Sequence, residues 1–340
     1  MDRNQKIRLD VVIPAYNEES MVDPLLVALS KAFSVEQLES HGVASVRIIF
    51  VDDGSTDRTV ELLQQRTKGG VPADIVRLSR NFGHQSAVSA GLVHSSADVV
   101  AVIDADLQDP PELILDMVDK WRDGFDVVYG ERRNRKENFF KKAAYWAFYR
   151  IISFLSEIDI PRDAGDFSLM DRRVVDAIVA LPEKLRFVRG LRTWVGFRQT
   201  ALPYDRPSRA AGETKYPFSR LYRLATDGIA SLSIRPLRIA QLITMCYSMM
   251  FLALVVVFVV MALNHETYGV SLWTLLTYTL IVSGNAAICL CLYILGAYVG
   301  RGYLEEKARP TFIVAEVIGC TTDEPASPGH TTNDSEAKRT

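Results

Sequence analysis

The chain has 340 residues, which is long enough for one sizeable globular domain and a further part. Its 39 Lys and Arg residues almost balance its 41 Asp and Glu residues, so its overall charge does not indicate a nucleic-acid-binding protein. The four cysteines indicate neither a disulfide framework nor a zinc site.

Short apolar runs alternate with longer helix-like stretches as far as Arg238, which predicts an α/β fold around a mostly parallel sheet. Strands are expected at Leu9–Ile13, Val46–Val51, Asp74–Leu78, Val99–Ile103 and Asp126–Tyr129. Helices are expected at Glu19–Phe33, Asp57–Gln65, Gln85–Ser95 and Pro111–Trp121. Thr56 or Asp57 suits the cap of the second helix, and Asp109, before two prolines, suits the start of the fourth.

Polar loops follow three of these strands: "PAYNEE" (Pro14–Glu19), "DDGSTD" (Asp52–Asp57) and "DADLQD" (Asp104–Asp109). In an open parallel sheet, ligands bind beyond the carboxyl ends of the strands, so the three loops are expected to converge on one crevice. Three acidic loops repel one another unless they share a cation or a hydrogen-bonding ligand. Their convergence therefore predicts a binding site.

The third loop offers oxygen ligands for a hard cation. A turn after Asp104 would aim its carboxylate, that of Asp106 and the amide of Gln108 at one Mg²⁺ or Mn²⁺ ion on a nucleoside diphosphate. A bare D-x-D is as often a solvated turn, and the neighbouring acidic loops are what favours the metal site. The glycine and the distal glutamate of an EF-hand are missing, which disfavours a calcium loop.

The first two loops are candidates for binding a nucleoside. Asp52 and Asp53, at a strand end, can accept hydrogen bonds from a base N–H or from ribose hydroxyls, and Glu18 can bind ribose in the same way. Pro14 would shape the wall of its loop. No G-x-G-x-x-G follows the first strand and no G-x-x-x-x-G-K-[ST] occurs, which disfavours a dinucleotide-binding site and a P-loop.

Two basic clusters are candidates for binding phosphate. The first follows the fifth strand and contains Arg132 and Arg133, and the second contains Arg206, Arg209 and Lys215. Arginine suits bidentate contacts to phosphate. A solvated surface is the alternative for the first cluster, and contact with anionic lipid head groups is the alternative for the second.

Two nearly charge-free segments, Ile239–Leu263 and Leu272–Val299, each exceed the roughly 20 residues that span a bilayer core. Buried core helices are the alternative, which their length disfavours. Basic residues flank the pair while the connection has none, so the positive-inside rule places both flanks in the cytoplasm. The first residues lack the apolar stretch of a cleaved signal peptide.

Five motifs resemble, in order and spacing, the family-two glycosyltransferases with a GT-A fold that act on polyprenyl phosphates. They are "VVIPAYNEE", "VDDGSTD", "SRNFGHQSAVSAG", "DADLQDPPE" and "GDFSLMDRRVVDA". Within that group the chain is most similar to bacterial bactoprenol (undecaprenyl-phosphate) glucosyltransferases and, more distantly, to dolichyl-phosphate mannose synthases. The resemblance extends from about Leu9 to Ile318 and includes the two apolar segments.

The resemblance implies inverting transfer of a monosaccharide from a nucleotide sugar, with UDP-glucose expected, to undecaprenyl or another polyprenyl phosphate. The implied catalytic residues are Asp166, Asp106, Arg132 and Arg206. The implied nucleotide-sugar-binding residues are Pro14, Tyr16, Glu18, Asp52, Asp53 and Asp104. The acceptor phosphate would bind Arg133, Arg206, Arg209 and Lys215, and Mg²⁺ or Mn²⁺ would bind Asp104, Asp106 and Gln108.

The roles of three positions in these motifs, Asp166, Ser168 and His84, do not follow from their chemistry alone. Asp166 is expected near the acceptor as a base or an orienting group, and a helix cap or another structural role stays open. Close relatives tend to read G-D-F-R where this chain has Ser168, so a cation near the phosphates is absent or is replaced by Arg172 or Arg173. His84 stands where some relatives carry Lys and is interpreted as a polar loop residue.

The expected organisation is a cytosolic GT-A domain at 1–215, amphipathic juxtamembrane helices at 216–238, two transmembrane helices at 239–299, a cytosolic segment at 300–319 and a disordered tail at 320–340. The resemblance places the chain in a bacterial plasma membrane with both termini cytoplasmic. It also implies a homotetramer, with a flippase and a multi-span glycosyltransferase acting downstream.

Three other functions stay open. The sugar donor can differ from UDP-glucose. The alternatives are UDP-galactose, a UDP-N-acetylhexosamine, UDP-amino-arabinose and GDP-mannose. A processive polysaccharide synthase is disfavoured because only two spans follow the domain and no Q-x-x-R-W stretch occurs. A membrane-anchored scaffold with a decayed transferase site is favoured by Ser168 and disfavoured by the intact Asp104, Asp106 and Gln108.

Overall fold

The computed structural model describes residues 3, 5–67, 72–133, 164–184, 186–205, 235–263 and 270–319. Within them, an eight-stranded sheet has the order β7-β5-β6-β4-β1-β2-β3-β8. The strands are β1 (Ile7–Ala15), β2 (Val43–Asp52), β3 (Ala73–Leu78), β4 (Val99–Val102), β5 (Val127–Arg133), β6 (Ala164–Asp171), β7 (Gln199–Asp205) and β8 (Val314–Ile318). The helices are α1 (Val22–Ala32), α2 (Val35–Ser40), α3 (Thr59–Arg66), α4 (His84–His94), α5 (Leu113–Arg122), α7 (Arg172–Ala180), α8 (Val188–Trp194), α10 (Arg235–Leu263) and α11 (Val270–Glu306).

Four adjacent strands form the parallel part of the sheet. β1 pairs in parallel with β2 and β4, and β2 pairs in parallel with β3. β6 runs antiparallel between β4 and β5, β7 is parallel to β5 at one edge, and β8 is antiparallel to β3 at the other. The five predicted strands and the mostly parallel α/β sheet are confirmed.

The sequence pattern does not predict β6, β7 or β8. β7 and β8 are edge strands, and most of their residues are exposed or half-buried, so neither presents a continuous apolar run. β6 begins with "AGDFS", in which small and charged residues interrupt the apolar pattern that predicts a strand. Sequence patterns detect strands that are continuous apolar runs, and none of these three strands is one.

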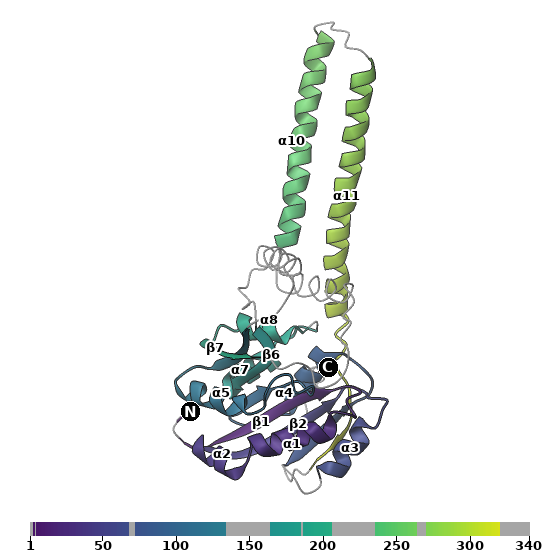
Figure 1. Ribbon diagram of the computed structural model, residues 1–340. Coiled ribbons are helices and arrows are strands. Elements are labelled where there is room, and N and C mark those ends of the chain that lie inside the picture. Colours follow the sequence, from purple (N-terminus) through teal and green to yellow (C-terminus); the bar gives the residue numbers. More distant parts are fainter. Residues whose placement is uncertain are drawn as a thin grey trace, which may run out of the picture.

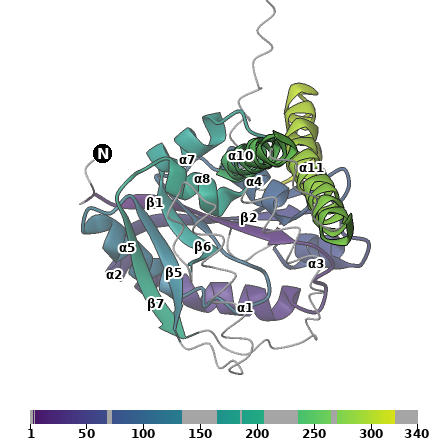
Figure 2. The same ribbon diagram turned by 90° about the horizontal axis from the view of Figure 1, so that it is seen from above.

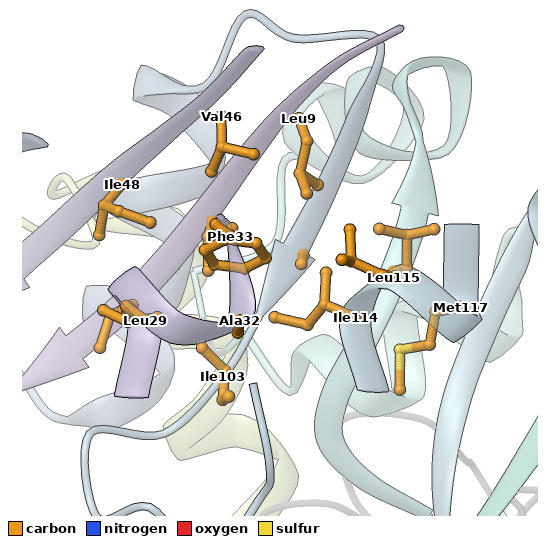
Figure 3. Packing of buried hydrophobic residues seen from close by; sticks show 14 of the residues in the cluster. Leu9, Leu29, Ala32, Phe33, Val46, Ile48, Ile103, Ile114, Leu115 and Met117 are labelled. Atoms are coloured by element: carbon orange, nitrogen blue, oxygen red, sulfur yellow. The ribbon is translucent and has the colours of Figure 1, made fainter. Parts of the chain in front are cut away.

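Helices cover both faces of the sheet (Figure 2). α1, α3 and α5 pack on one face, where Leu29 and Ile114 belong to the same apolar cluster (Figure 3). α4, α7 and α8 pack on the other face, where Ala87 belongs to a second cluster. Successive residues of β1 point to opposite faces, so Val11 joins the first cluster and Val12 the second.

Gly91 allows α4 to lie close to the sheet. A Cβ atom at this position would lie 2.2 Å from Cγ1 of Val12. Gly91→Ala is therefore expected to destabilise the protein by about 1–3 kcal/mol, although alanine favours a helix. Thermal unfolding in detergent is expected to show a Tm lower by at least about 2 °C.

The matched control is Gly302→Ala in α11, where an added Cβ would meet no atom within 4 Å. This control is expected to leave the Tm unchanged or slightly higher, because alanine has the better helix propensity. An unchanged Tm in the Gly91 variant would show that α4 can move away from β1 at little cost.

Two long helices extend from one side of the α/β domain (Figure 1). α10 has 29 residues and α11 has 37, and the Thr244 hydroxyl of α10 lies 3.7 Å from the Cys291 sulfur of α11. In the described part of the chain, Leu280–Glu306 is long and apolar enough to cross a membrane, whereas the apolar stretch in α10, Leu237–Ala253, is shorter. Both predicted segments are helical, and the second membrane span stays a prediction.

The end of α11 is attached to the α/β domain. The backbone N–H of Lys184, between α7 and α8, contacts both carboxylate oxygens of Glu305 at 3.0 and 2.9 Å. The Ser79 N–H donates to the Ile313 carbonyl at 2.9 Å, and β8 then pairs with β3. α8 lies on the side of the domain that faces the two long helices (Figure 1).

Candidate active site

The three acidic loops lie together at the carboxyl edge of the sheet. The Asp53 N–H, in the second loop, donates to the Ala15 carbonyl of the first loop at 2.9 Å. Ala15, Glu18 and Ala105, from the first and third loops, line one small cavity. The loops therefore meet as the parallel topology predicts.

The "DADLQD" loop is a tight turn. Leu107 has a φ of 55°, and the Gln108 N–H donates to the Asp106 carboxylate at 3.1 Å. The Asp104 side chain is 32% exposed, and Asp106 and Gln108 are half-buried. Burial, opposed by His84 and reinforced by neighbouring carboxylates, raises the pKa of Asp104 to about 6. A cation held at this turn would favour the ionised carboxylate and reverse that shift.

The residues of this turn fit a divalent cation that bridges to phosphate. Mg²⁺ and Mn²⁺ need only one or two carboxylates when phosphate and water supply the other oxygens, and Asp104 and Asp106 supply two. Among the described side chains, no three His, Cys, Asp or Glu residues gather as a complete metal site. The turn therefore suits a metal that binds together with its nucleotide.

Asp109 lies in the interior. Only 1% of it is exposed, its carboxylate accepts a hydrogen bond from the Tyr204 hydroxyl, and the Arg132 guanidinium is 3.9 Å away. The prediction that Asp109 starts the next helix is wrong, because α5 begins at Leu113 after Glu112. Burial and the hydrogen bond raise the pKa of Tyr204 to about 12, which keeps it a donor. Asp109 thus pairs with Arg132, whose Nε also donates a hydrogen bond to the Tyr204 hydroxyl at 3.4 Å.

Asp52 and Asp53 hold their own loops. Asp52 is fully buried and accepts a hydrogen bond from the Ser55 N–H at 3.1 Å. Asp53 accepts hydrogen bonds from the N–H groups of Phe82 and Gly83 at 2.7 and 2.9 Å. Burial raises the pKa of Asp53, although these two donors oppose the change. Both carboxylates shape the walls of the crevice, and their contact with a nucleoside stays a prediction.

The other predicted nucleoside-binding residues differ in exposure. Tyr16 is 44% exposed, Pro14 is buried in β1, and Glu18 is half-buried with its N–H donating to the Thr59 hydroxyl at 2.9 Å. Tyr16 thus offers an open aromatic ring at the rim of the crevice.

Part of the predicted phosphate-binding set falls outside the described residues. Arg206, Arg209 and Lys215 lie there, and so does the segment 134–163 that follows β5. Arg132 and Arg133 belong to the end of β5, where their Cα atoms pair with those of β7. The roles of all five stay predictions.

Asp166, on β6, is the centre of a charged cluster. Its Oδ2 accepts hydrogen bonds from the His84 imidazole at 3.2 Å and from the Gln85 amide at 3.0 Å. Nε of Arg189 lies 3.5 Å from Asp166 Oδ1. Nε2 of His84 is also 3.7 Å from the Asp104 carboxylate, so the cluster adjoins the metal loop.

The charges in this cluster stabilise one another. Burial tends to raise the pKa of Asp166, but the His84 hydrogen bond and the arginine charges outweigh it and hold that pKa well below its usual range. Burial tends to lower the pKa of His84, but the hydrogen bond to Asp166 and the charge of Asp104 outweigh it and raise that pKa. An ionised Asp166 that already accepts two hydrogen bonds suits orientation better than proton transfer.

Arg192 supplies a buried cation whose charge helps to lower the pKa of Asp166. Its guanidinium lies 5.3 Å from the centroid of the Tyr129 ring, and Tyr129 pairs with the buried Ser168 of β6. Burial lowers the pKa of Arg192 to about 10, so it stays protonated at neutral pH. Arg172 and Arg173 make ion pairs at the opposite end of β6, so the prediction that one of them replaces a cation at Ser168 is wrong.

Sequence reasoning missed His84, Gln85, Arg189 and Arg192 as parts of the site. A signal was available for the first two, because they begin the helix after β3 and therefore also lie at the carboxyl edge of the sheet. The two arginines are on α8, and nothing local in their sequence indicates that α8 packs behind β6.

A family model described as "Glycosyl transferase family 2" matches residues 10–179. The chain is 42% identical over 319 residues to "Uncharacterized glycosyltransferase YkcC" of Bacillus subtilis, with 93% of this chain and 96% of the relative covered. It is 34% identical to "Prophage bactoprenol glucosyl transferase homolog" of Escherichia coli, with 92% and 99% covered. It is 33% identical to "Bactoprenol glucosyl transferase" of Shigella phage SfX, with 91% and 99% covered.

Among solved structures, the mannosyltransferase PcManGT from Pyrobaculum calidifontis in complex with GDP-Man and Mn²⁺ is 15% identical. The match covers 89% of each chain, with a TM-score of 0.41.

Proposed function

Because this chain belongs to glycosyl transferase family 2, we propose that it transfers one glucose from UDP-glucose to a polyprenyl phosphate such as undecaprenyl phosphate. The chain is a glycosyltransferase with a Rossmann-like, mostly parallel GT-A sheet. The observation that carries the proposal is the match to proteins named bactoprenol glucosyl transferase, which covers 91–92% of the chain and so extends beyond the family-two domain.

The reaction exchanges one phosphate for another at the sugar. The bond between the anomeric carbon and the UDP oxygen breaks, and UDP leaves with the electron pair. An oxygen of the acceptor phosphate forms the new bond on the opposite face, which inverts the configuration. This oxygen is already an anion at neutral pH, so its attack needs no strong general base. The protein has to supply charge stabilisation and orientation.

The residues at the carboxyl edge can be assigned to these tasks. Asp104, Asp106 and Gln108 would hold Mg²⁺ or Mn²⁺, and the bound ion supplies positive charge against the charge that develops on the leaving UDP. Tyr16 would cover the base with its exposed ring. Arg132, held by Asp109, would bind a phosphate.

We propose that α10 and α11 both span a bacterial plasma membrane, with the α/β domain and both termini in the cytoplasm. The apolar stretch Leu280–Glu306 supports one span, and the absence of Lys and Arg in the connection 264–269 supports the orientation. The attachment of α11 to the domain at Glu305 would hold the site near the membrane surface, where a lipid phosphate lies.

Transfer of radiolabelled sugar into the lipid fraction tests this function. Purified full-length protein with Mg²⁺ or Mn²⁺ and undecaprenyl phosphate is expected to use UDP-glucose in preference to UDP-galactose, UDP-N-acetylglucosamine, UDP-amino-arabinose and GDP-mannose. Preference for another donor would correct the sugar alone. An active bactoprenol glucosyltransferase serves as the positive control. If the control is active and this protein transfers sugar from none of these donors, the proposed enzymatic activity is wrong and a scaffold is favoured.

Removal of divalent metal is expected to abolish the transfer. Treatment with EDTA followed by desalting should reduce the rate at least about 100-fold, because the leaving diphosphate would lose its counter-charge. Added Mg²⁺ or Mn²⁺ should restore the rate, whereas Na⁺ at matched ionic strength should not. Full activity in the chelated protein would contradict a metal at Asp104 and Asp106.

A further inference from the structure

The cluster around Asp166 contains polar groups to which the proposed reaction assigns no ligand. We propose that His84 and Arg189, oriented by Asp166, bind hydroxyl groups of the hexose carried by the donor. This inference rests on the proposed function, because it assumes that a nucleotide sugar is bound at the metal loop.

The cluster adjoins the place where the hexose must lie. Asp104 and Asp106 belong to one turn, to which the donor diphosphate is assigned. Nε2 of His84 is 3.7 Å from the Asp104 carboxylate. The hexose is bonded directly to the second phosphate of the donor, so a side chain next to this turn is within reach of the sugar.

Both side chains are anchored on one side and open on the other. Nε2 of His84 faces Asp166, while its side chain is 43% exposed and its Nδ1 has no hydrogen-bond partner in the described ranges. Arg189 is 29% exposed, and its Nε lies 3.5 Å from Asp166 without a hydrogen bond. Each side chain can therefore contact a ligand without leaving Asp166.

The alternation of charge favours a neutral, hydroxyl-rich ligand over a second phosphate. Two carboxylates, Asp104 and Asp166, lie 3.7 and 3.2 Å from the His84 imidazole. A phosphate bound to His84 would be repelled by both. A sugar hydroxyl can donate to a carboxylate and accept from an imidazole N–H or a guanidinium, so a hexose can use both kinds of group.

Gln85 fixes the two binding groups relative to each other. Its amide nitrogen donates to Asp166 at 3.0 Å, and its amide oxygen accepts from the Val188 N–H at 2.8 Å. It thereby ties α4, which begins with His84, to α8, which carries Arg189. Groups held in place before the ligand arrives lose less entropy on binding.

Calorimetric titration of full-length protein in detergent with Mg²⁺ tests the inference, with UDP and UDP-glucose titrated separately. His84→Gln keeps a donor toward Asp166 but lacks the Nδ1 edge. The ratio of the UDP-glucose Kd to the UDP Kd is expected to rise at least about tenfold, while the UDP Kd stays within about twofold of wild type. Arg189→Gln is expected to change the ratio in the same direction.

His41→Gln is the matched control, because His41 makes a comparable pair with Asp119 on the surface, at 2.8 Å. It is expected to leave the ratio unchanged. A wild-type ratio in His84→Gln would overturn the inference, and so would equal weakening of UDP and UDP-glucose. Should the donor panel identify another sugar, its nucleotide replaces UDP-glucose here. The titration needs no turnover, so absent sugar transfer would count against the proposed function alone.

Discussion

Asp106→Asn is expected to lower the rate of sugar transfer at least about 100-fold, because a neutral amide is a poor ligand for a divalent ion. The turn itself should survive, since the asparagine oxygen can still accept the Gln108 N–H that Asp106 accepts at 3.1 Å. The initial rate of label transfer into lipid, at saturating donor and acceptor, measures the effect.

The control for this substitution is Asp116→Asn on the exposed face of α5, which removes the same charge away from the loops. It is expected to retain the wild-type rate. If Asp106→Asn stays within about tenfold of the wild-type rate, this carboxylate does not hold a catalytic metal.

Asp166→Asn is expected to reduce kcat/KM for UDP-glucose at least about 100-fold. The substitution removes the negative charge that His84 and Arg189 both face, at 3.2 and 3.5 Å, and with it their fixed orientation. It also leaves the buried Arg192 without that counter-charge, so a lower Tm is expected. Steady-state rates corrected for the folded fraction separate the two effects.

Asp176→Asn tests whether any loss of a paired carboxylate has this effect. Asp176 is an exposed residue of α7 that pairs with Arg172 at 3.0 Å, and exposed pairs contribute little to stability. This variant is expected to behave as wild type. If the kcat/KM of Asp166→Asn, corrected for the folded fraction, is close to that of Asp176→Asn, then Asp166 has a structural role and does not contribute to catalysis.

The buried strands could be predicted from the sequence because each is a short apolar run between turn residues. The edge strand β8 could not, since its five residues are mostly exposed and follow an apolar helix in the chain. The role of Asp109 could not be predicted for a similar reason. Two prolines after an acidic residue are typical of a helix start, but its partner Tyr204 lies 95 positions away.

The same distinction applies to the candidate site. The turn that carries Asp104, Asp106 and Gln108 could be predicted because the three residues are close in the sequence, and metal binding by this turn stays a prediction. His84, Asp166 and Arg189 come from α4, β6 and α8, and only the packing of these elements brings them together. Sequence periodicity carries no information about such tertiary neighbours.

Mass spectrometry of the lipid product, together with identification of the released nucleotide, tests the proposed reaction most directly. The expected result from UDP-glucose and undecaprenyl phosphate is a lipid monophosphate that carries one hexose, with UDP as the only nucleotide product. Release of UMP with a diphosphate-linked sugar would contradict it, because the bond broken would then lie between the two phosphates of the donor. A lipid bearing a chain of hexoses would contradict it as well.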